Sequence, residues 1–456
     1  MTTTSKISGF NGIEINPGDA EYDDARSLFN SMIDRRPQVI LRCTSADDVV
    51  AVVNYARDSG LPLSVYGGGH SVTGAAVVDG GVVCDMRGMK GIDVDPGARR
   101  ARAEAGLNWG EFDTATQEHG LAVTGGRVPD TGIAGLALGS GSGWLERKLG
   151  FTCDNLVKAE VVTADGRKVM ASADENPELF WGIRGGGGNF GIVTAFHLQL
   201  HEIPPMLLGG LLAWPAFMGA DVTRMYRDLV AGAPDDFGSA LAFITAPPED
   251  FVPEPARGQP AVGMVVCWTG DLEEGERFLA PVRGFGPPAV DLTGPMPYVA
   301  VQQLLEPGNP RGRRNYWTGD FLTELPDEAI DAFVHHAAQP VSPFSQMILI
   351  PGGGAISRVP EDASAFGQRQ APFNIHLLSM WEGAEHDAAN IAYTKDISGA
   401  MKAWTTGAVY LNFIGDEGAE RVRSGFGPEK FARLQALKKE WDPQNLFRHN
   451  QNIPPA

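Results

Sequence analysis

The stretch TGGRVPDTGIAGLALGSGSGW, residues 124–144, contains seven glycines. Glycine at this density is incompatible with a stable helix of ordinary length. It suits a backbone that passes close to an extended ligand, because glycine has no side chain to hold the two apart. A glycine-rich bulge or barrel corner is the structural alternative. The stretch therefore marks the first place to look for a ligand.

Glycine is also concentrated on either side of this stretch. Of the 57 glycines in the 456-residue chain, 27 lie between positions 67 and 191, including clusters at 67–69 and 185–191. No Gly-X-Y repeat is present, and hydrophobic residues make up 43% of the chain. These features exclude collagen-like and disordered proteins. The three clusters together predict a backbone that wraps around one ligand.

Charge and cysteine content narrow the class of protein. The net charge is −19 at pH 7 and the basic clusters are short, which disfavours nucleic acid and membrane surfaces as partners. Cys43, Cys84, Cys153 and Cys267 lie at least 41 residues apart, so no metal-binding spacing is present. Neither a signal peptide nor an apolar run of about 18 residues is visible. We expect a cytoplasmic protein without a metal ion that acts on a small molecule and could form oligomers.

The glycines at 186–191, GGGNFG, satisfy the dinucleotide-binding pattern GxGxxG. That pattern binds a pyrophosphate when a strand precedes it and a helix follows it. Here residues 177–183 are predicted to form a helix before it, and residues 192–200 a strand after it. Because the order is reversed, the pattern argues against an NAD-dependent dehydrogenase, which is one rival class of enzyme.

Several longer motifs carry a resemblance to a known family. They are YGGGHS (66–71), the glycine-rich stretch at 125–143, LERKLGFTCDNL (145–156) and LFWGIRGGGGNFGIVT (179–194). These motifs resemble the FAD domain of the vanillyl-alcohol-oxidase type. AVYLNFIGDEG (408–418) and WDPQNLFRHNQNI (441–453) are similar to the C-terminal segment of berberine-bridge-like oxidases. The resemblance covers about residues 35–205 and 405–455 and is loose between them.

The resemblance implies an α+β fold in two parts. Residues 1–204 form an FAD-binding domain of the PCMH type, which a C-terminal segment, 405–456, completes. Residues 205–404 form an α+β substrate-binding domain with an antiparallel sheet. The residues agree with this division, because glycine becomes sparse after Pro204 and Pro205, and longer apolar runs alternate with predicted helices such as 326–338. A last helix is predicted over residues 428–441.

The resemblance also implies which residues bind FAD. His70 is expected to be joined covalently to the 8α-methyl carbon of the flavin, although by residue type alone a solvated or hydrogen-bonded histidine is the simpler expectation. Tyr66 stands where many relatives have arginine, which leaves its contact with FAD open. Cys153 is expected to be a buried structural thiol near the cofactor, with a second flavin bond as the less favoured alternative. The expected FAD-binding residues are Tyr66, Gly67, Gly68, Gly69, His70, Ser71, Gly126, Thr131, Gly132, Gly135, Gly139, Gly141, Gly143, Cys153, Asn155, Gly191, Ile192, Val193, Asn450 and Asn452.

The activity that the resemblance implies is that of a flavin-dependent oxidase. FAD takes a hydride from a C–H next to N or O of a small amine or alcohol, and dioxygen reoxidises the flavin to give hydrogen peroxide. Three alternatives stay open. They are an oligosaccharide or secondary metabolite as substrate, a dehydrogenase that uses another electron acceptor, and a protein that binds flavin without turnover.

Tyr410 and Asn412 are the candidate catalytic residues. They lie two positions apart on an expected strand and therefore share one face of it, where the resemblance places polar groups that face the substrate. A core tyrosine with a satisfied hydroxyl is an equally supported alternative. Further candidates for the lining of the substrate pocket are Tyr316, Trp317, His376 and Trp381, which lie in the loosely matched region.

Overall fold

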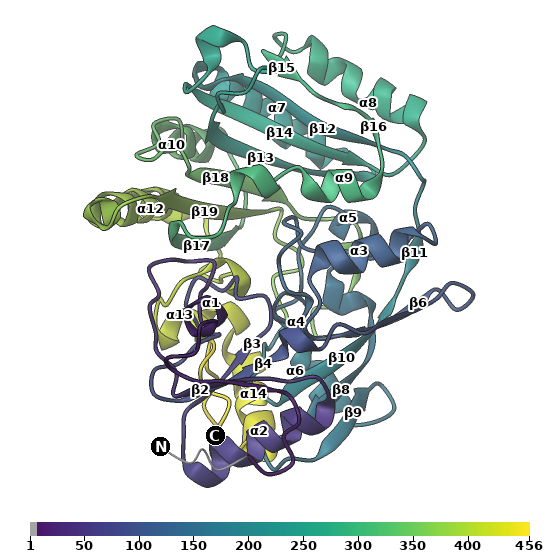
Figure 1. The fold of residues 1–456 in the computed structure, drawn as a ribbon. Coiled ribbons are helices and arrows are strands. Elements are labelled where there is room, and N and C mark those ends of the chain that lie inside the picture. Colours follow the sequence, from purple (N-terminus) through teal and green to yellow (C-terminus); the bar gives the residue numbers. More distant parts are fainter. Residues whose placement is uncertain (1–6) are drawn as a thin grey trace.

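The computed structural model describes residues 7–456, which form two parts stacked on one another (Figure 1). The upper part in Figure 1 is built on one large antiparallel sheet, in teal and green. The lower part combines the N-terminal segment, in purple and blue, with the C-terminal segment, in yellow. This arrangement confirms the α+β class. No helix within residues 7–456 is long and apolar enough to cross a membrane.

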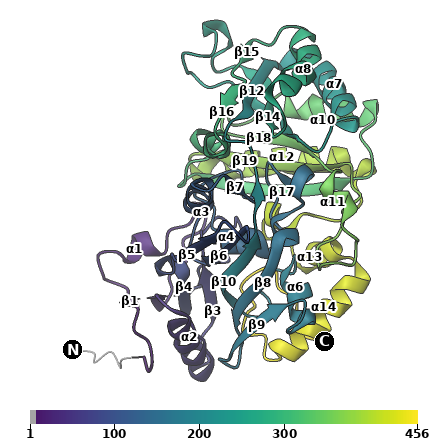
Figure 2. The ribbon, with the colours of Figure 1, turned by 90° about the vertical axis from the view of Figure 1, so that its right-hand side faces the viewer.

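Two sheets frame the lower part, in the strand orders β1-β2-β4-β3 and β5-β6-β10-β8-β9. In the first, β2, β4 and β3 run parallel and β1 is antiparallel to β2. The second is antiparallel throughout. The strands are β1 (Ile13–Ile15), β2 (Val39–Arg42), β3 (Leu63–Tyr66), β4 (Val82–Asp85), β5 (Ile92–Asp95), β6 (Arg100–Glu104), β8 (Leu156–Val162), β9 (Lys168–Ser172) and β10 (Ile192–Gln199). A separate short pair, β7 (Leu121–Ala122) with β11 (His201–Glu202), lies near the junction of the two parts, where Figure 1 labels β11 and Figure 2 labels β7.

The two longer helices of the N-terminal segment begin at residues whose side chains cap them. Ser45 accepts the amide hydrogen of Asp48 at the start of α2 (Ala46–Ser59), and Asn108 forms a reciprocal capping box with Glu111 at the start of α3 (Trp109–Gln117). Each such cap is worth about 1 kcal/mol. The shorter helices are α1 (Tyr22–Ala25), α4 (Ile133–Leu138), α5 (Glu146–Leu149) and α6 (Pro177–Ile183). Because α6 precedes the glycines at 185–191 and β10 follows them, the order that argues against a dinucleotide fingerprint is confirmed.

The eight-stranded sheet of the upper part has the order β15-β12-β14-β13-β18-β19-β17, with β16 paired to β12. Its strands are β12 (Leu207–Pro215), β13 (Phe237–Thr245), β14 (Pro260–Trp268), β15 (Val290–Asp291), β16 (Gly294–Met296), β17 (Arg314–Leu322), β18 (Gln346–Pro351) and β19 (Phe373–Trp381). The helices are α7 (Gly219–Ala231), α8 (Leu272–Gly284), α9 (Tyr298–Gln303), α10 (Asp327–Ala337), α11 (Ala355–Arg358) and α12 (Asp387–Met401). Four of them, α7, α8, α10 and α12, bury residues such as Tyr226, Phe333 and Ile397 in one core with the sheet.

The C-terminal segment returns to the lower part as α13 (Ala419–Phe426) and α14 (Pro428–Trp441), the second at the predicted position. Leu434 and Leu437 of α14 join the core of the lower part, and Figure 2 shows α14 beside α6. A Cβ added at Gly182 in α6 would lie 2.2 Å from Leu437. Glycine at this position lets the two helices pack closely.

Candidate active site

One cavity of about 370 Å³ lies between the two parts of the molecule. Its lower wall contains residues from all three glycine clusters and, from the C-terminal segment, Phe447, His449, Asn450 and Gln451. Its roof comes from the eight-stranded sheet, through Ala240 of β13, Val265 of β14, Ile348 of β18 and His376 of β19. Segments that are far apart in the sequence thus converge on one site.

The glycines of the lower wall serve two different purposes. A Cβ added at Gly68 would lie 2.2 Å from the backbone nitrogen of Gly132, and one added at Gly132 would lie 2.3 Å from the backbone nitrogen of Gly68. These two loops need glycine in order to touch each other. At Gly135 and Gly188, which also line the cavity, an added Cβ would meet no neighbouring atom within 4 Å. Glycine there leaves space beside the backbone for a ligand.

The lower wall fits FAD in its chemistry as well as its shape. Successive glycine amides provide the donors that bind phosphate groups. His449 Nε2, Asn450 Oδ1 and Asn452 Oδ1 are buried without a protein partner, and the first two residues line the cavity. Buried polar atoms are rarely left unsatisfied in a folded protein. These atoms therefore indicate a bound polar ligand at this wall.

Most of the expected FAD-binding residues line the cavity. They are Gly67, Gly68, Gly69, His70, Ser71, Gly126, Thr131, Gly132, Gly135, Gly139, Gly191, Ile192, Val193 and Asn450. The lining does not include Tyr66, Gly141, Gly143, Cys153, Asn155 and Asn452. The Tyr66 hydroxyl instead donates to the Ser27 carbonyl, and the Asn155 amide donates to the carbonyls of Leu149 and Phe151. The Tyr66 hydroxyl and the Asn155 amide thus have hydrogen-bond partners within the protein, and direct contact of either side chain with FAD stays a prediction.

His70 lies in the cavity wall within a network that joins the two parts. Its Nε2 is 2.6 Å from Oδ1 of Asp130, and Nε of Arg311, from the upper part, is 2.7 Å from the other carboxylate oxygen. The imidazole stacks on Phe29 with 4.5 Å between ring centroids. Burial lowers the pKa of His70 although Asp130 opposes it, so the imidazole is neutral at pH 7. The negative charge of Asp130 beside Nε2 favours the tautomer that carries its proton on Nε2 and leaves Nδ1 unprotonated.

The carboxylate of Asp130 is held in its ionised form. Burial alone would raise its pKa, but the contacts with His70 and Arg311 outweigh burial and lower the pKa of Asp130. Sequence reasoning did not find Asp130 or Arg311. The one available signal was the place of Asp130 inside the glycine-rich stretch, because its partner Arg311 is 181 residues away in the chain.

The prediction that Tyr410 and Asn412 lie on a strand is wrong. Residues Leu411–Phe413 form a short 3₁₀ helix, so the two side chains do not share a face of a strand. The Tyr410 hydroxyl accepts the amide hydrogens of Gly141 and Ser142, at 3.1 and 2.9 Å. Burial raises the pKa of Tyr410 to about 12, and the residue lines a separate, smaller cavity. These contacts favour the core-tyrosine alternative, and a catalytic role for Tyr410 stays a prediction.

Asn412 does line the main cavity. Its Nδ2 donates to the Leu136 carbonyl of α4 at 3.2 Å. A Cβ added at Gly139 would lie 2.0 Å from Asn412 Oδ1, so the amide fills the space that this glycine leaves. The C-terminal segment is thereby fixed against the glycine-rich stretch.

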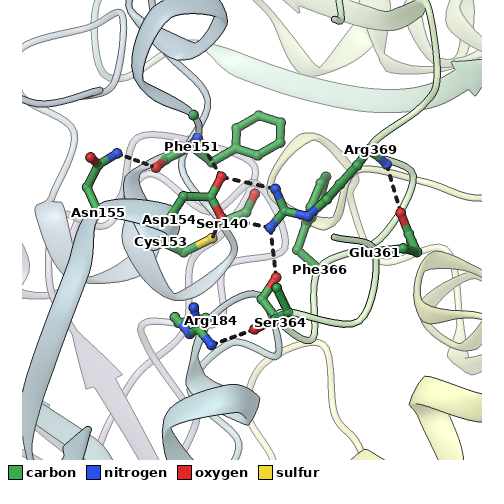
Figure 3. Close-up of polar contacts among 12 residues, drawn as sticks. Ser140, Phe151, Cys153, Asp154, Asn155, Arg184, Glu361, Ser364, Phe366 and Arg369 are labelled. Carbon is green, nitrogen blue, oxygen red and sulfur yellow. Dashed lines mark hydrogen bonds and ion pairs between the residues drawn. The ribbon is translucent and has the colours of Figure 1, made fainter. Parts of the chain in front are cut away.

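Cys153 lies in a buried apolar cluster beside the cavity, with Phe366 and Tyr410 among its members. Figure 3 shows it next to Asp154, whose carboxylate accepts two hydrogen bonds from the buried Arg369, at 2.7 and 3.0 Å. Burial raises the pKa of the Cys153 thiol well above its ordinary value. Because the thiolate is the nucleophilic form, this environment supports a structural thiol over a second flavin bond.

Two of the four pocket candidates in the upper part line the cavity, namely Trp317 and His376. His376 stacks on Phe413 with 3.9 Å between ring centroids and meets Trp317 edge-on at 5.2 Å. Burial, with a smaller contribution from Arg127, lowers the pKa of His376 to about 3. The lining also contains Arg127, Asn309 and Gln346, for which the sequence carried no signal.

The two-part fold and its glycine-walled cavity define an FAD-dependent oxidoreductase of the PCMH type. Residues 37–172 match the FAD binding domain family, and residues 409–454 match the family described as berberine and berberine like. The chain is 34% identical over 460 residues to (R)-6-hydroxynicotine oxidase of Paenarthrobacter nicotinovorans, with 97% of each chain covered. The protein therefore belongs to the berberine-bridge-like family of FAD-linked oxidoreductases, and its cofactor is FAD.

Solved structures show the same architecture. 6-Hydroxy-D-nicotine oxidase from Arthrobacter nicotinovorans has a TM-score of 0.89 at 31% identity, over 99% of this chain and 100% of the other. Xylooligosaccharide oxidase from Myceliophthora thermophila has a TM-score of 0.86 at 20% identity, over 98% of this chain and 97% of the other. The second likeness shows a shared fold alone.

Proposed function

We propose that the protein oxidises a small amine or alcohol by removing a hydride from a C–H next to N or O, with dioxygen as the electron acceptor and hydrogen peroxide as the product. The observation that carries this proposal is the cavity of about 370 Å³ in which the glycine-rich lower wall meets a buried, largely apolar roof. Full-length similarity to a 6-hydroxynicotine oxidase supports oxidation of a small molecule.

Residues of the lower wall are placed to bind the cofactor, and residues of the roof are placed to enclose the substrate. When bound, FAD supplies the ring that accepts the hydride. Gly135 and Gly188 let the backbone approach the cofactor, and His449 and Asn450 offer it unpaired polar atoms. The sheet above closes the site with apolar side chains such as Val265 and Ile348, which exclude water from the reacting atoms.

We further propose that His70 tethers the flavin through Nδ1, which forms the bond to the 8α carbon. Asp130, at 2.6 Å from Nε2, supports this by holding the imidazole in one orientation and one tautomer. His70→Ala should yield a protein from which denaturation releases all of the FAD, whereas the unchanged protein should stay fluorescent on a denaturing gel. Flavin that remained attached to the His70→Ala variant would contradict a single tether and would direct attention to Cys153.

The reaction is tested by mixing the purified holoenzyme with a panel of amines, alcohols and sugars without oxygen, and then admitting air. We expect one class to bleach the flavin absorbance and air to restore it with release of one hydrogen peroxide per turnover. Restoration by a quinone dye but not by air would make the protein a dehydrogenase. Bleaching by oligosaccharides alone would exclude the small-substrate proposal.

A further inference from the structure

The lining of the cavity contains almost no charged side chains. Among the described residues that line it, none is Asp, Glu or Lys, and the one permanently charged side chain is that of Arg127. Arg127 is itself neutralised, because its guanidinium lies 2.9 Å from the buried carboxylate of Glu146. A substrate that enters this cavity therefore meets no unpaired charge.

A cationic substrate is disfavoured by this arrangement. An ammonium group buried without a carboxylate loses its hydration and gains no counter-charge. Aromatic faces are the usual substitute for a carboxylate, but one face of each of three rings in the lining is already occupied. His376 stacks on Phe413, and His70 stacks on Phe29. The guanidinium carbon of Arg127 lies over the Trp144 ring, 4.8 Å from the ring centroid.

His376 offers a neutral hydrogen-bonding atom in the roof. The residue is 6% exposed, it lines the cavity, and neither of its ring nitrogens is hydrogen-bonded to another described residue. The ring is clamped between Phe413, which lies parallel to it within 2°, and the edge of Trp317. A fixed and unpaired imidazole nitrogen is suited to a hydroxyl group, because a hydroxyl can both donate and accept.

We propose that the substrate is a neutral alcohol on an apolar or aromatic carbon frame, and that His376 binds its hydroxyl group. The inference rests on the proposed oxidase function and specifies its substrate class. The carbinol C–H bond breaks and its electron pair leaves as hydride to FAD, while the hydroxyl proton is released as the carbonyl forms. Dioxygen then takes the two electrons and two protons, so that one alcohol and one dioxygen give one carbonyl compound and one hydrogen peroxide.

The test compares matched pairs that differ only in the reacting group, such as 1-phenylethanol and 1-phenylethylamine, or cyclohexanol and cyclohexylamine. Flavin reduction is followed without oxygen at pH 7, where the amines are ammonium ions, and binding is measured from the change in flavin absorbance. We expect the alcohols to bind and reduce the flavin, and the amines to do neither. Reduction by the amines as fast as by the alcohols would overturn the substrate class and leave the oxidase proposal standing. Dithionite reduces the flavin chemically and serves as the positive control. If dithionite reduced the flavin but none of the alcohols or amines did, both the substrate class and the proposed oxidase function would fail.

Two substitutions test the role of His376. His376→Leu removes the hydrogen bond, and we expect roughly a tenfold or greater rise in KM for alcohols. His376→Gln keeps a neutral polar group of similar reach, and should restore much of the loss. The flavin content and visible spectrum of both variants report whether the site still assembles. Equal KM values for the unchanged protein and the two variants, all with intact flavin, would show that His376 does not bind the substrate.

Discussion

At the scale of single residues, glycine has two physical roles in this protein. Gly68 and Gly132 permit two backbones to touch, with a Cβ at either position only 2.2–2.3 Å from the other backbone. Gly135 sits inside α4 and faces open space in the cavity. Composition alone counts these glycines together, although one kind supports the fold and the other supports the ligand.

Two alanine substitutions separate these roles. Gly132→Ala should destabilise the protein because its Cβ cannot avoid backbone atoms, and a low yield of folded protein or a reduced free energy of unfolding would show it. Gly135→Ala should leave the apoprotein at least as stable, since alanine favours a helix by up to about 1 kcal/mol over glycine. The same change should weaken FAD binding, which equilibrium titration measures when both proteins also carry His70→Ala and cannot form the covalent bond. Equal FAD affinity with and without Gly135→Ala in that background would contradict a role for Gly135 in FAD binding.

A second residue-scale prediction concerns the carboxylate that orients His70. Asp130→Asn keeps the size of the side chain and removes the charge that favours the Nε2–H tautomer. We expect attachment of FAD to slow on the order of 100-fold, measured by in-gel flavin fluorescence after mixing apoprotein with FAD. The matched control is Asp165→Asn, at an exposed turn. Identical attachment rates for the two variants would exclude a role for Asp130.

At the scale of elements, α14 owes its position to a buried ion pair. Lys438 donates to Asp442 at 2.7 Å and to the carbonyls of Asn189 and Phe447, and neither charged side chain is exposed. Burial lowers the pKa of Lys438 while Asp442 opposes it. Because Asn189 belongs to the third glycine cluster, one side chain ties the C-terminal helix to the cavity wall.

Removing that side chain tests the contribution of the pair. Lys438→Met leaves the Asp442 carboxylate buried and unpaired, so we expect a loss of about 3–5 kcal/mol in the free energy of unfolding. Urea denaturation followed by tryptophan fluorescence measures it. Lys439→Met, at the next and exposed position of the same helix, is the control and should change stability little. A loss of similar size in both variants would argue against a specific role for the buried pair.

At the scale of the whole molecule, the two parts are joined by polar contacts that the sequence does not reveal. Arg311 reaches Asp130 and Arg369 reaches Asp154, each across the junction. Gln302 of α9 donates to Asp113 of α3 at 2.8 Å. Burial raises the pKa of Asp113 to about 7, although Gln302 opposes the shift. The junction therefore contains a carboxyl group that favours its protonated form.

This carboxyl group makes stability depend on pH. In the folded state Asp113 keeps its proton up to about pH 7, whereas in the unfolded chain it loses the proton near its ordinary pKa of 3.8. Its contribution is therefore complete below pH 3.8 and is lost as the pH rises toward 7. Asp113→Asn should remove this decline between pH 4 and 7 and make the protein more stable than the parent at pH 8. Urea unfolding at several pH values across this range measures the decline, and the exposed Asp93→Asn is the control that should keep it. If the free energy of unfolding of Asp113→Asn fell with pH as steeply as that of the parent, the assignment to Asp113 would be wrong.

Local signals predicted a good part of the fold. Ser45 and Asn108 cap α2 and α3 through contacts with residues only three positions further on, and the last helix spans Pro428–Trp441 as predicted. The strand expected at 410–412 failed, because the Tyr410 hydroxyl is held by amides of residues 141 and 142, more than 260 residues away. Such a contact outweighs the weak β preference of a short segment.

The sequence by itself determined the family, the flavin cofactor and the segments that surround it, because glycine spacing, capping residues and long motifs act through neighbours along the chain. Only the tertiary structure decided which glycines touch each other and which face the cavity. It also decided that His70 and Arg311 both meet Asp130 and that His376 packs between Phe413 and Trp317. The physical reason is that backbone clearance, desolvation and charge pairing depend on distances in space, and folding brings these groups together from distant parts of the chain.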